Sequence, residues 1–443
     1  MTFLKGLYLP NRFFYAAASL ILIMILSYAF PFLMAVAQAG GVLLVLIFSV
    51  DVLLLYNKNV RIILEREVPG VLSLGDSNLV RLSAASKSSL KLWIQLVDEL
   101  PEQFQARDFR IYFELSPNES KELSYPLRPL SRGEYHFGKI HLYLSTRIGI
   151  ATRKVTHPLD QMVPVYPSII QMRKYELKTF ARVANEYGVK KVRRIGHSYE
   201  FEHIKQYVRG DDYRSINWKA TGRRTQLMVN MYEDEKSQQV YCIIDKSRVM
   251  HMPFNGLSLF DYAVNATLVI SNIVLRKQDK VGLITFAETP KALVKADRSR
   301  QQLKKILETL YREKEGNGEA NYESMYLSVR KFVNGRSLMF FYTNFESTYA
   351  LQRALPQLRK LNDQHLLVVV FFENTEITAN TSAQVETVED IYRQVTAEHF
   401  ILTKVQLVQQ LKQFGIITIL TRPENLTVAS INKYLELKSR GMI

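Results

Sequence analysis

The chain has 443 residues, 47% of them hydrophobic, and a formal net charge of +16 at pH 7. This length exceeds one ordinary core, so two or three folded units are expected. The only cysteine, Cys242, excludes an internal disulfide and lies within an apolar run, where a reduced, buried thiol is normal. The excess of positive charge suits an anionic membrane surface or a nucleic acid.

The first 57 residues are predicted to form a transmembrane helical hairpin. Residues 13–31 contain no charged side chain and, as a helix, are long enough to cross a bilayer core of about 30 Å. Residues 32–56 form a second apolar run, in which Gln38 and Asp51 are the unfavourable groups. Pro31 marks the bend between the two spans.

Basic residues flank the hairpin on both outer sides and predict its orientation. Lys5 and Arg12 precede the first span, and Lys58 and Arg61 follow the second. By the positive-inside rule, both ends and the bulk of the chain face the cytoplasm at a cell inner membrane. The alternative is a cleaved signal peptide, since residues 35–37 fit a small-x-small cleavage pattern. The second apolar run favours an anchor instead.

Residues 58–165 have the pattern of a small antiparallel β-sandwich. Short runs of alternating apolar and polar residues, such as 79–82, 90–94 and 140–144, are separated by Pro-Gly, Gly-Asp and Pro-Asn pairs. Several short strands with turn residues between them are typical of a sandwich domain. Residues 166–235 then form a mixed connector before the last domain.

Residues 236–443 alternate between strand-like and helix-like segments, which predicts an α/β fold with a doubly wound, mostly parallel sheet. The expected strands are 239–244, 281–286, 338–342, 366–372 and 416–420. The expected helices are 259–276, 298–312, 351–361 and 388–414. Asp245 and Ser247 follow the first strand directly, at the sheet edge where open α/β sheets place their sites.

A dense polar and aromatic motif occupies residues 210–220 of the connector. Its candidate functional residues are Gly210, Asp211, Asp212, Arg214, Asn217, Trp218 and Lys219. In one interpretation the motif is a brace: the glycine permits a turn, a carboxylate caps amides or pairs with Arg214, and Trp218 seals the connector against the α/β domain. In the other, the same residues form a docking surface for a partner.

The motif resembles the G-D-D-x-R-x-I-D/N-W-K-A motif of the bacterial DUF58 family, from Gly210 to Ala220. This resemblance implies a membrane-tethered protein with a β-sandwich and a von Willebrand factor A-like domain. It also implies a partner, since family members commonly work beside MoxR-type AAA+ ATPases in chaperone-like or assembly roles. The family's D-P-F/L-G-L turn corresponds to residues 146–150, which keep the glycine but lack the Asp and Pro.

The resemblance also implies where a divalent cation would bind. Von Willebrand A domains hold Mg²⁺ with an Asp-x-Ser-x-Ser loop, a Thr and a distal Asp. Here the loop is Asp245-Lys246-Ser247-Arg248-Val249, Ala320 takes the place of the Thr, and Asn344 that of the distal Asp. Asp245, Ser247 and Asn344 therefore form a degenerate metal site, and we expect no cofactor because Mg²⁺ should not bind tightly to so poor a ligand set.

No catalytic constellation accompanies these features. The chain has no phosphate-binding glycine-rich loop and no Cys–His pair in reach by spacing, so an enzyme is not expected. Basic clusters at 190–194 and 222–224 lack interleaved aromatic residues, so nucleic acid is not expected either. The sequence favours a membrane-anchored, protein-binding scaffold. The rivals are a metal-dependent adhesion-type module that binds an acidic ligand, and an enzyme of unknown chemistry.

Overall fold

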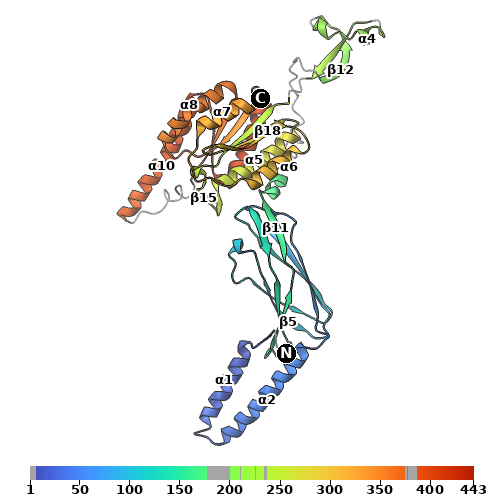
Figure 1. Ribbon diagram of the computed structural model, residues 1–443, viewed down its shortest axis with the longest axis vertical. Helices are drawn as coiled ribbons and strands as arrows, with labels where there is room; N and C mark the ends of the chain where they lie inside the picture. The colour runs from blue at the N-terminus through green and yellow to red at the C-terminus, as the bar shows by residue number, and fades with distance from the viewer. Residues whose placement is uncertain are drawn as a thin grey trace. The chain divides into compact units, whose positions relative to one another are not determined.

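The computed structural model describes residues 6–176, 200–209, 211–224, 226–233, 237–374, 377 and 387–443. The chain divides into two compact units, Met1–Ile169 and Ile170–Ile443 (Figure 1). The first unit contains two apolar helices and a group of β-strands, and the second contains a mixed α/β sheet.

Two apolar helices begin the first unit. Helix α1 spans Asn11–Leu26 and helix α2 spans Phe32–Leu55, so α1 ends before the predicted limit at residue 31. Helix α1 buries no residue, and α2 is long and apolar enough to cross a membrane. Apolar helices that are exposed in this way indicate a membrane association. Helix α5 (Leu259–Arg276) is also long and apolar, but it is buried inside the second unit.

The rest of the first unit is built from short strands, as the alternating sequence pattern predicts. They are β1 (Leu7–Tyr8), β2 (Ile62–Glu67), β3 (Leu72–Ser73), β4 (Asn78–Ser86), β5 (Leu92–Asp98), β6 (Arg110–Leu115), β7 (Ser120–Leu127), β8 (Gly133–Phe137), β9 (Ile140–Ser145), β10 (Thr152–His157) and β11 (Gln161–Tyr166), with the 3₁₀ turn η1 at Glu102–Phe104. They form sheets β1-β10-β9-β5-β6, β2-β4-β7 and β3-β11-β8, in which only β3 and β11 pair in parallel.

A buried ion pair links two of these sheets. Arg66 of β2 lies 2.6 Å from Asp98 of β5, and both side chains are almost completely buried. The Tyr125 hydroxyl donates a further hydrogen bond to Asp98. Burial raises the pKa of Asp98, and the neighbouring Arg66 and Tyr125 oppose this shift. Removing one member would leave the remaining buried polar groups with fewer hydrogen-bond partners, so the pair stabilises the contact between the sheets.

A buried carboxylate joins helix α2 to the strands. Asp51 accepts hydrogen bonds from the hydroxyl of Thr146 and from the N–H groups of Ile150, at 2.9 Å, and Ala151, at 2.8 Å. Arg153 adds a bond to the Leu55 carbonyl at 2.8 Å. The turn that keeps only the glycine of the family pattern therefore holds the end of α2.

The second unit is organised around a six-stranded sheet. Its strands are β14 (Gln239–Asp245), β17 (Lys280–Phe286), β18 (Pro290–Asp297), β19 (Leu338–Tyr342), β20 (Leu366–Phe372) and β21 (Ile417–Thr421). The order is β18-β17-β14-β19-β20-β21, and every neighbouring pair is parallel except β17 with β18. The sheet is therefore mixed, because its edge strand β18 is antiparallel. This strand was not part of the predicted pattern.

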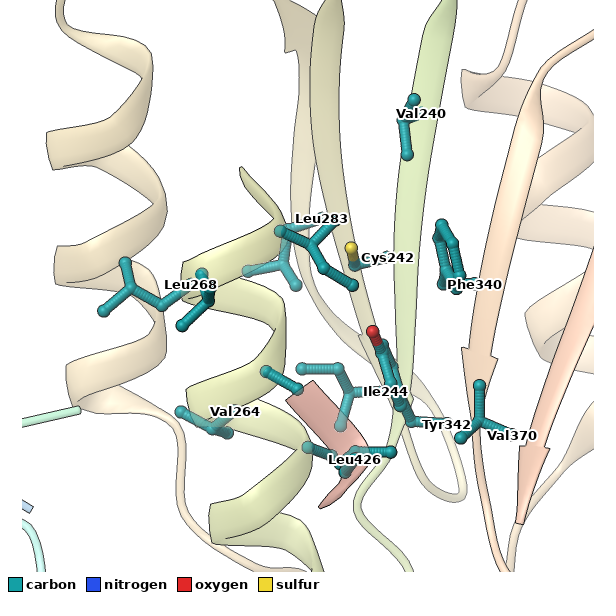
Figure 2. Close-up of a cluster of buried hydrophobic side chains, with 14 of the residues drawn as sticks. Val240, Cys242, Ile244, Val264, Leu268, Leu283, Phe340, Tyr342, Val370 and Leu426 are labelled. Atoms are coloured by element: carbon teal, nitrogen blue, oxygen red, sulfur yellow. The ribbon is translucent and has the colours of Figure 1, made fainter. Parts of the chain in front are cut away.

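Helices cover both faces of this sheet. Besides α5 they are α6 (Gln302–Arg312), α7 (Tyr322–Phe332), α8 (Thr348–Gln364), α10 (Val388–Gln413) and α11 (Leu426–Ser439). Alternate residues of β14 enter two separate cores: Cys242 and Ile244 face α5 and α11 (Figure 2), whereas Tyr241 and Ile243 face α7 and α8. Helices α7 and α11 were not predicted. Burial raises the pKa of Cys242 to about 12, so the thiol stays protonated.

Smaller elements complete the second unit. A two-stranded antiparallel ribbon of β12 (Glu200–Gln206) and β13 (Met228–Glu233) encloses the connector motif, which contains the 3₁₀ turn η2 (Tyr213–Ser215) and the short helix α4 (Trp218–Thr221). After β14 come η3 (Arg248–Met250), β15 (Pro253–Phe254) and β16 (Leu257–Ser258), and η4 (Pro423–Asn425) precedes α11.

Candidate functional site

The first candidate site lies at the carboxyl edge of the parallel sheet. Strands β14 and β19 are parallel neighbours, so Asp245 at the end of the first and Thr343 just after the second come together. The Asp245 carboxylate is fully buried and accepts hydrogen bonds from the Ser247 N–H and the Thr343 hydroxyl, each at 2.8 Å. Both oxygens of the carboxylate are thus engaged by neighbouring loops.

Burial controls the protonation of this carboxyl group. Loss of solvent raises the pKa of Asp245 above its ordinary value, and the hydrogen bonds from Ser247 and Thr343 oppose the shift only in part. Lys246, the next residue, directs its ammonium to Glu313 at 2.6 Å, with both side chains largely buried. The lysine charge is therefore neutralised by Glu313.

The other predicted ligand positions have different roles. The Asn344 amide oxygen accepts a hydrogen bond from the Lys404 ammonium of α10, and its nitrogen lies 3.5 Å from the Val249 carbonyl. Ala320 packs against the apolar core on the α7 side of the sheet. An alanine methyl offers no ligand atom, and the ammonium takes the place that a cation would need beside Asn344.

These donors do not fit a tightly bound Mg²⁺ ion. The site offers one carboxylate, already used by two hydrogen bonds, the buried hydroxyl of Ser247, and an amide oxygen that an ammonium occupies. Mg²⁺ demands a near-octahedral set of oxygen ligands and loses its water reluctantly. Across the part of the chain that the structure describes, no three His, Cys, Asp or Glu side chains are grouped so that they could hold a metal ion.

A cavity of about 410 Å³ adjoins Asn344 and was not predicted from the sequence. Its lining is mostly apolar and includes Leu259, Phe372 and Phe400, with Lys404 among them. Burial lowers the pKa of Lys404 to about 8, and the charge of Glu346 opposes the shift. A sequence signal did exist, because Lys404 follows Phe400 and Ile401 at helical spacing. It therefore belongs to an otherwise apolar stripe of the helix.

The polar residues of the connector motif are hydrogen-bonded within the motif or to residues just before it. Asp211 accepts from the Lys205 ammonium at 2.8 Å and the Val208 N–H at 3.0 Å; the lysine is the main cause that lowers the pKa of this carboxyl. Asp212 caps η2 through the Arg214 N–H at 3.0 Å, and Asn217 caps α4 through the Ala220 N–H at 2.9 Å. Gly210 lies outside the described residues.

The aromatic residues of the motif are exposed. Trp218 is 72% and Tyr213 69% exposed, and the Arg214 guanidinium lies over the Tyr213 ring at 5.7 Å. Lys219 is exposed as well. The capping bonds agree with a local brace, but Trp218 does not provide the seal that the brace interpretation assigned to it. Large exposed aromatic side chains and an arginine are the residue types expected of a docking surface.

These observations define the class: a membrane-associated protein with a strand-built first unit and a mixed α/β second unit. Residues 203–386 match the family described as "Protein of unknown function DUF58". Over this segment, the resemblance indicated by the motif is confirmed.

Relatives were also found among curated proteins and solved structures. "Uncharacterized protein YeaD" of Bacillus subtilis (strain 168) is 25% identical over 169 residues, which are 38% of this chain and 40% of the relative. The chain thus matches less than half the length of that relative. A "conserved hypothetical protein BatB" from Bacteroides thetaiotaomicron is 16% identical, over 46% of this chain and 99% of that one, with a TM-score of 0.31. An "aerotolerance-related membrane protein" from Bacteroides fragilis NCTC 9343 is 15% identical over the same shares, with a TM-score of 0.29.

Proposed function

We propose that this chain is a membrane-anchored scaffold that binds other proteins through a degenerate von Willebrand A-like domain. Counted along the chain from β14, the strands of the sheet have the order 3-2-1-4-5-6, which is the classic doubly wound order. This order supports the assignment of the domain. Helices α1 and α2 form the anchor, and the bulk of the chain lies on the cytoplasmic side of the inner membrane.

The observation that carries the proposal is the state of Asp245. Its carboxylate is buried and used by Ser247 and Thr343, while Lys404 occupies Asn344. A site arranged in this way holds loops together and leaves recognition to surface side chains instead of a metal ion. The exposed group of Tyr213, Arg214 and Trp218, here called the motif patch, has the residue types that dominate binding energy at protein interfaces.

The proposed partner is a MoxR-type AAA+ ATPase, in a chaperone-like or assembly role. The support for this pairing is the family resemblance of the motif, which is confirmed over residues 203–386. In this scheme the ATPase supplies the chemistry, and the chain itself is not an enzyme. It needs no cofactor of its own.

A pull-down tests this function. The full chain, solubilised from membranes in detergent, is used to capture the cell's MoxR-type ATPase with and without ATP. We expect Trp218→Ala to reduce capture at least about tenfold, the loss typical of an interface hot spot. Tyr349→Ala is the matched control, because Tyr349 is an equally exposed aromatic residue on α8. Equal capture by all three chains, or none by the wild type, would contradict the proposal.

Calorimetric titration with Mg²⁺ and Mn²⁺ tests the rival function. The donor set predicts no binding in the micromolar range. Micromolar binding that Asp245→Ala abolishes would instead establish a metal-dependent adhesion-type module that captures an acidic ligand.

A further inference from the structure

We propose that one sheet face of the first unit binds anionic phospholipid headgroups of the membrane that holds α1 and α2. The face, here called the aromatic face, carries Tyr8, Trp93, Tyr112 and Tyr143 with Lys91 and Lys154 at its margins. It lies on the outer side of sheet β1-β10-β9-β5-β6. The proposal rests on the membrane anchoring proposed above.

The strand register places these side chains in two adjacent rows. Tyr8 pairs with Thr152, Thr152 with Ser145, and Ser145 with Trp93, which forms the first row across four strands. The second row is two residues further along the strands and contains Lys154, Tyr143, Gln95 and Tyr112. Residues two apart on a strand point to the same side, so both rows share one face. The opposite face carries Leu92, Ile94 and Leu96, whose side chains are buried.

The first row lies next to the start of the membrane helix. Strand β1 ends at Tyr8, Pro10 is the N-cap of α1, and the helix begins at Asn11. Three residues span at most about 10 Å, and the headgroup layer on each side of a bilayer is roughly 5–8 Å thick. A cavity of about 510 Å³ opens on the face, and its lining includes Pro10 together with Tyr8 and Trp93. Whatever fills this cavity therefore lies at the depth of the headgroups.

The second membrane helix is attached at the same end of the sheet. Ser145 and Thr152 of the first row border the turn whose Ile150 and Ala151 N–H groups hold Asp51 of α2. Both helices therefore leave the strands beside this row. Two attachments fix the sheet relative to the helices better than one flexible linker would, so the first row stays close to the bilayer.

The residue types on this face suit a lipid surface. Tyr and Trp are enriched where proteins meet the membrane–water interface, because one end of each side chain is apolar and the other polar. Tyr112 is 69% and Tyr8 47% exposed. The Lys91 ammonium lies 5.2 Å from the Trp93 ring centre, and the Lys154 ammonium lies 5.7 Å from that of Tyr143. The Lys91 ammonium lies 2.5 Å from the exposed carboxylate of Glu114. Lipid phosphate groups would compete with this carboxylate for the lysine.

Trp93 provides a direct probe, because the chain has only two tryptophans and the other is Trp218. Full-length Trp218→Phe is reconstituted into vesicles of phosphatidylcholine and phosphatidylglycerol that carry a nitroxide quencher either on the headgroup or near the bilayer centre. We expect the headgroup quencher to reduce Trp93 emission at least about twofold more than the deep one. We also expect quenching to weaken when phosphatidylglycerol is omitted, because about 1 kcal/mol of attraction per cation is then lost.

Charge reversal shows whether the lysines contribute. Lys91→Glu with Lys154→Glu, in the Trp218→Phe chain, should remove the dependence on phosphatidylglycerol. Lys139→Glu is the matched control: this exposed lysine precedes β9, whose far end carries Ser145, and it should change nothing. Unchanged thermal unfolding of each variant excludes misfolding as the cause, and Lys91→Gln with Lys154→Gln serves if charge reversal impairs folding.

Extraction of the vesicles with alkaline carbonate separates the two ways of failing. If the chain is washed off, the proposed anchoring is wrong, and the lipid-binding face falls with it. If the chain stays in the vesicles but Trp93 is quenched by neither probe, or equally with and without phosphatidylglycerol, the anchor stands and the lipid-binding face is refuted.

Discussion

At the scale of single residues, the environment of a side chain decides its chemistry more than its type does. Asp245 was predicted from its place after an apolar strand, and that place is where the structure has it. What the sequence did not show is that Thr343, far away along the chain, donates to the carboxylate. Lys404 was missed for the same reason: nothing in one helix reveals that its ammonium meets Asn344.

Asp245→Asn should be tolerated, because an amide can still accept from the Ser247 N–H and can donate to the Thr343 hydroxyl. Burial raises the folded-state pKa of Asp245, so above about pH 4 this carboxyl group ionises more readily in the unfolded chain than in the folded one. This difference lowers the free energy of unfolding of the wild type. Wild-type stability relative to the variant should therefore fall as the pH rises from about 4 through the folded-state pKa, and then level off. Denaturant unfolding of both chains from pH 4 to 8 measures this difference.

Asp245→Ala is the companion variant and should destabilise at every pH in this range. It leaves a buried N–H and a buried hydroxyl without their acceptor, at a cost of about 1–3 kcal/mol each. A stability difference between wild type and Asp245→Asn that grows when Mg²⁺ is added would show that the carboxylate holds a metal ion after all.

At the scale of elements, a single polar group can define the role of a turn. The turn at residues 146–150 departs from the family pattern, and no sequence pattern explains this departure. In the structure its backbone and the neighbouring Ala151 N–H surround Asp51, which appeared in the sequence only as an unfavourable group within an apolar run. The cost of burying this carboxylate is offset by three hydrogen bonds, so it connects the helix to the strands.

Asp51→Leu should weaken this connection. The Ile150 and Ala151 N–H groups lose their acceptor, and each buried unsatisfied donor costs about 1–3 kcal/mol. We expect hydrogen exchange at these two amides to quicken at least tenfold in the detergent-solubilised chain, which corresponds to about 1.4 kcal/mol. Gln38→Leu is the control, since Gln38 is exposed on the same helix. Unchanged exchange in Asp51→Leu would mean that the turn is held by other contacts.

At the scale of the whole molecule, the distribution of charge and apolar surface favours one placement of the chain. Helices α1 and α2 expose apolar side chains, and the basic residues lie outside the hairpin instead of at its bend. The net charge of +16 adds attraction toward anionic headgroups. These features are the grounds on which we propose a cytoplasmic location for both units.

Protease treatment of intact spheroplasts tests this topology. We expect the second unit to remain undigested until the membrane is permeabilised, because the positive-inside rule keeps basic flanks in the cytoplasm. A cytoplasmic protein and a periplasmic protein of known location serve as controls. Digestion of the second unit in intact spheroplasts would reverse the orientation and would reopen the signal-peptide interpretation of residues 35–37.

Many of the local elements could be predicted from composition and periodicity, although β18, α7 and α11 could not. Continuous apolar runs indicated β14, β19 and β20, and long apolar stretches indicated α1 and α2, because burial and bilayer thickness act directly on composition. The folded chain was needed to show which polar atoms meet: Thr343 with Asp245, Lys404 with Asn344, and Asp51 with the turn at residues 146–150. Hydrogen bonds depend on distances of a few ångströms between segments far apart in the chain, and periodicity carries no information about such distances.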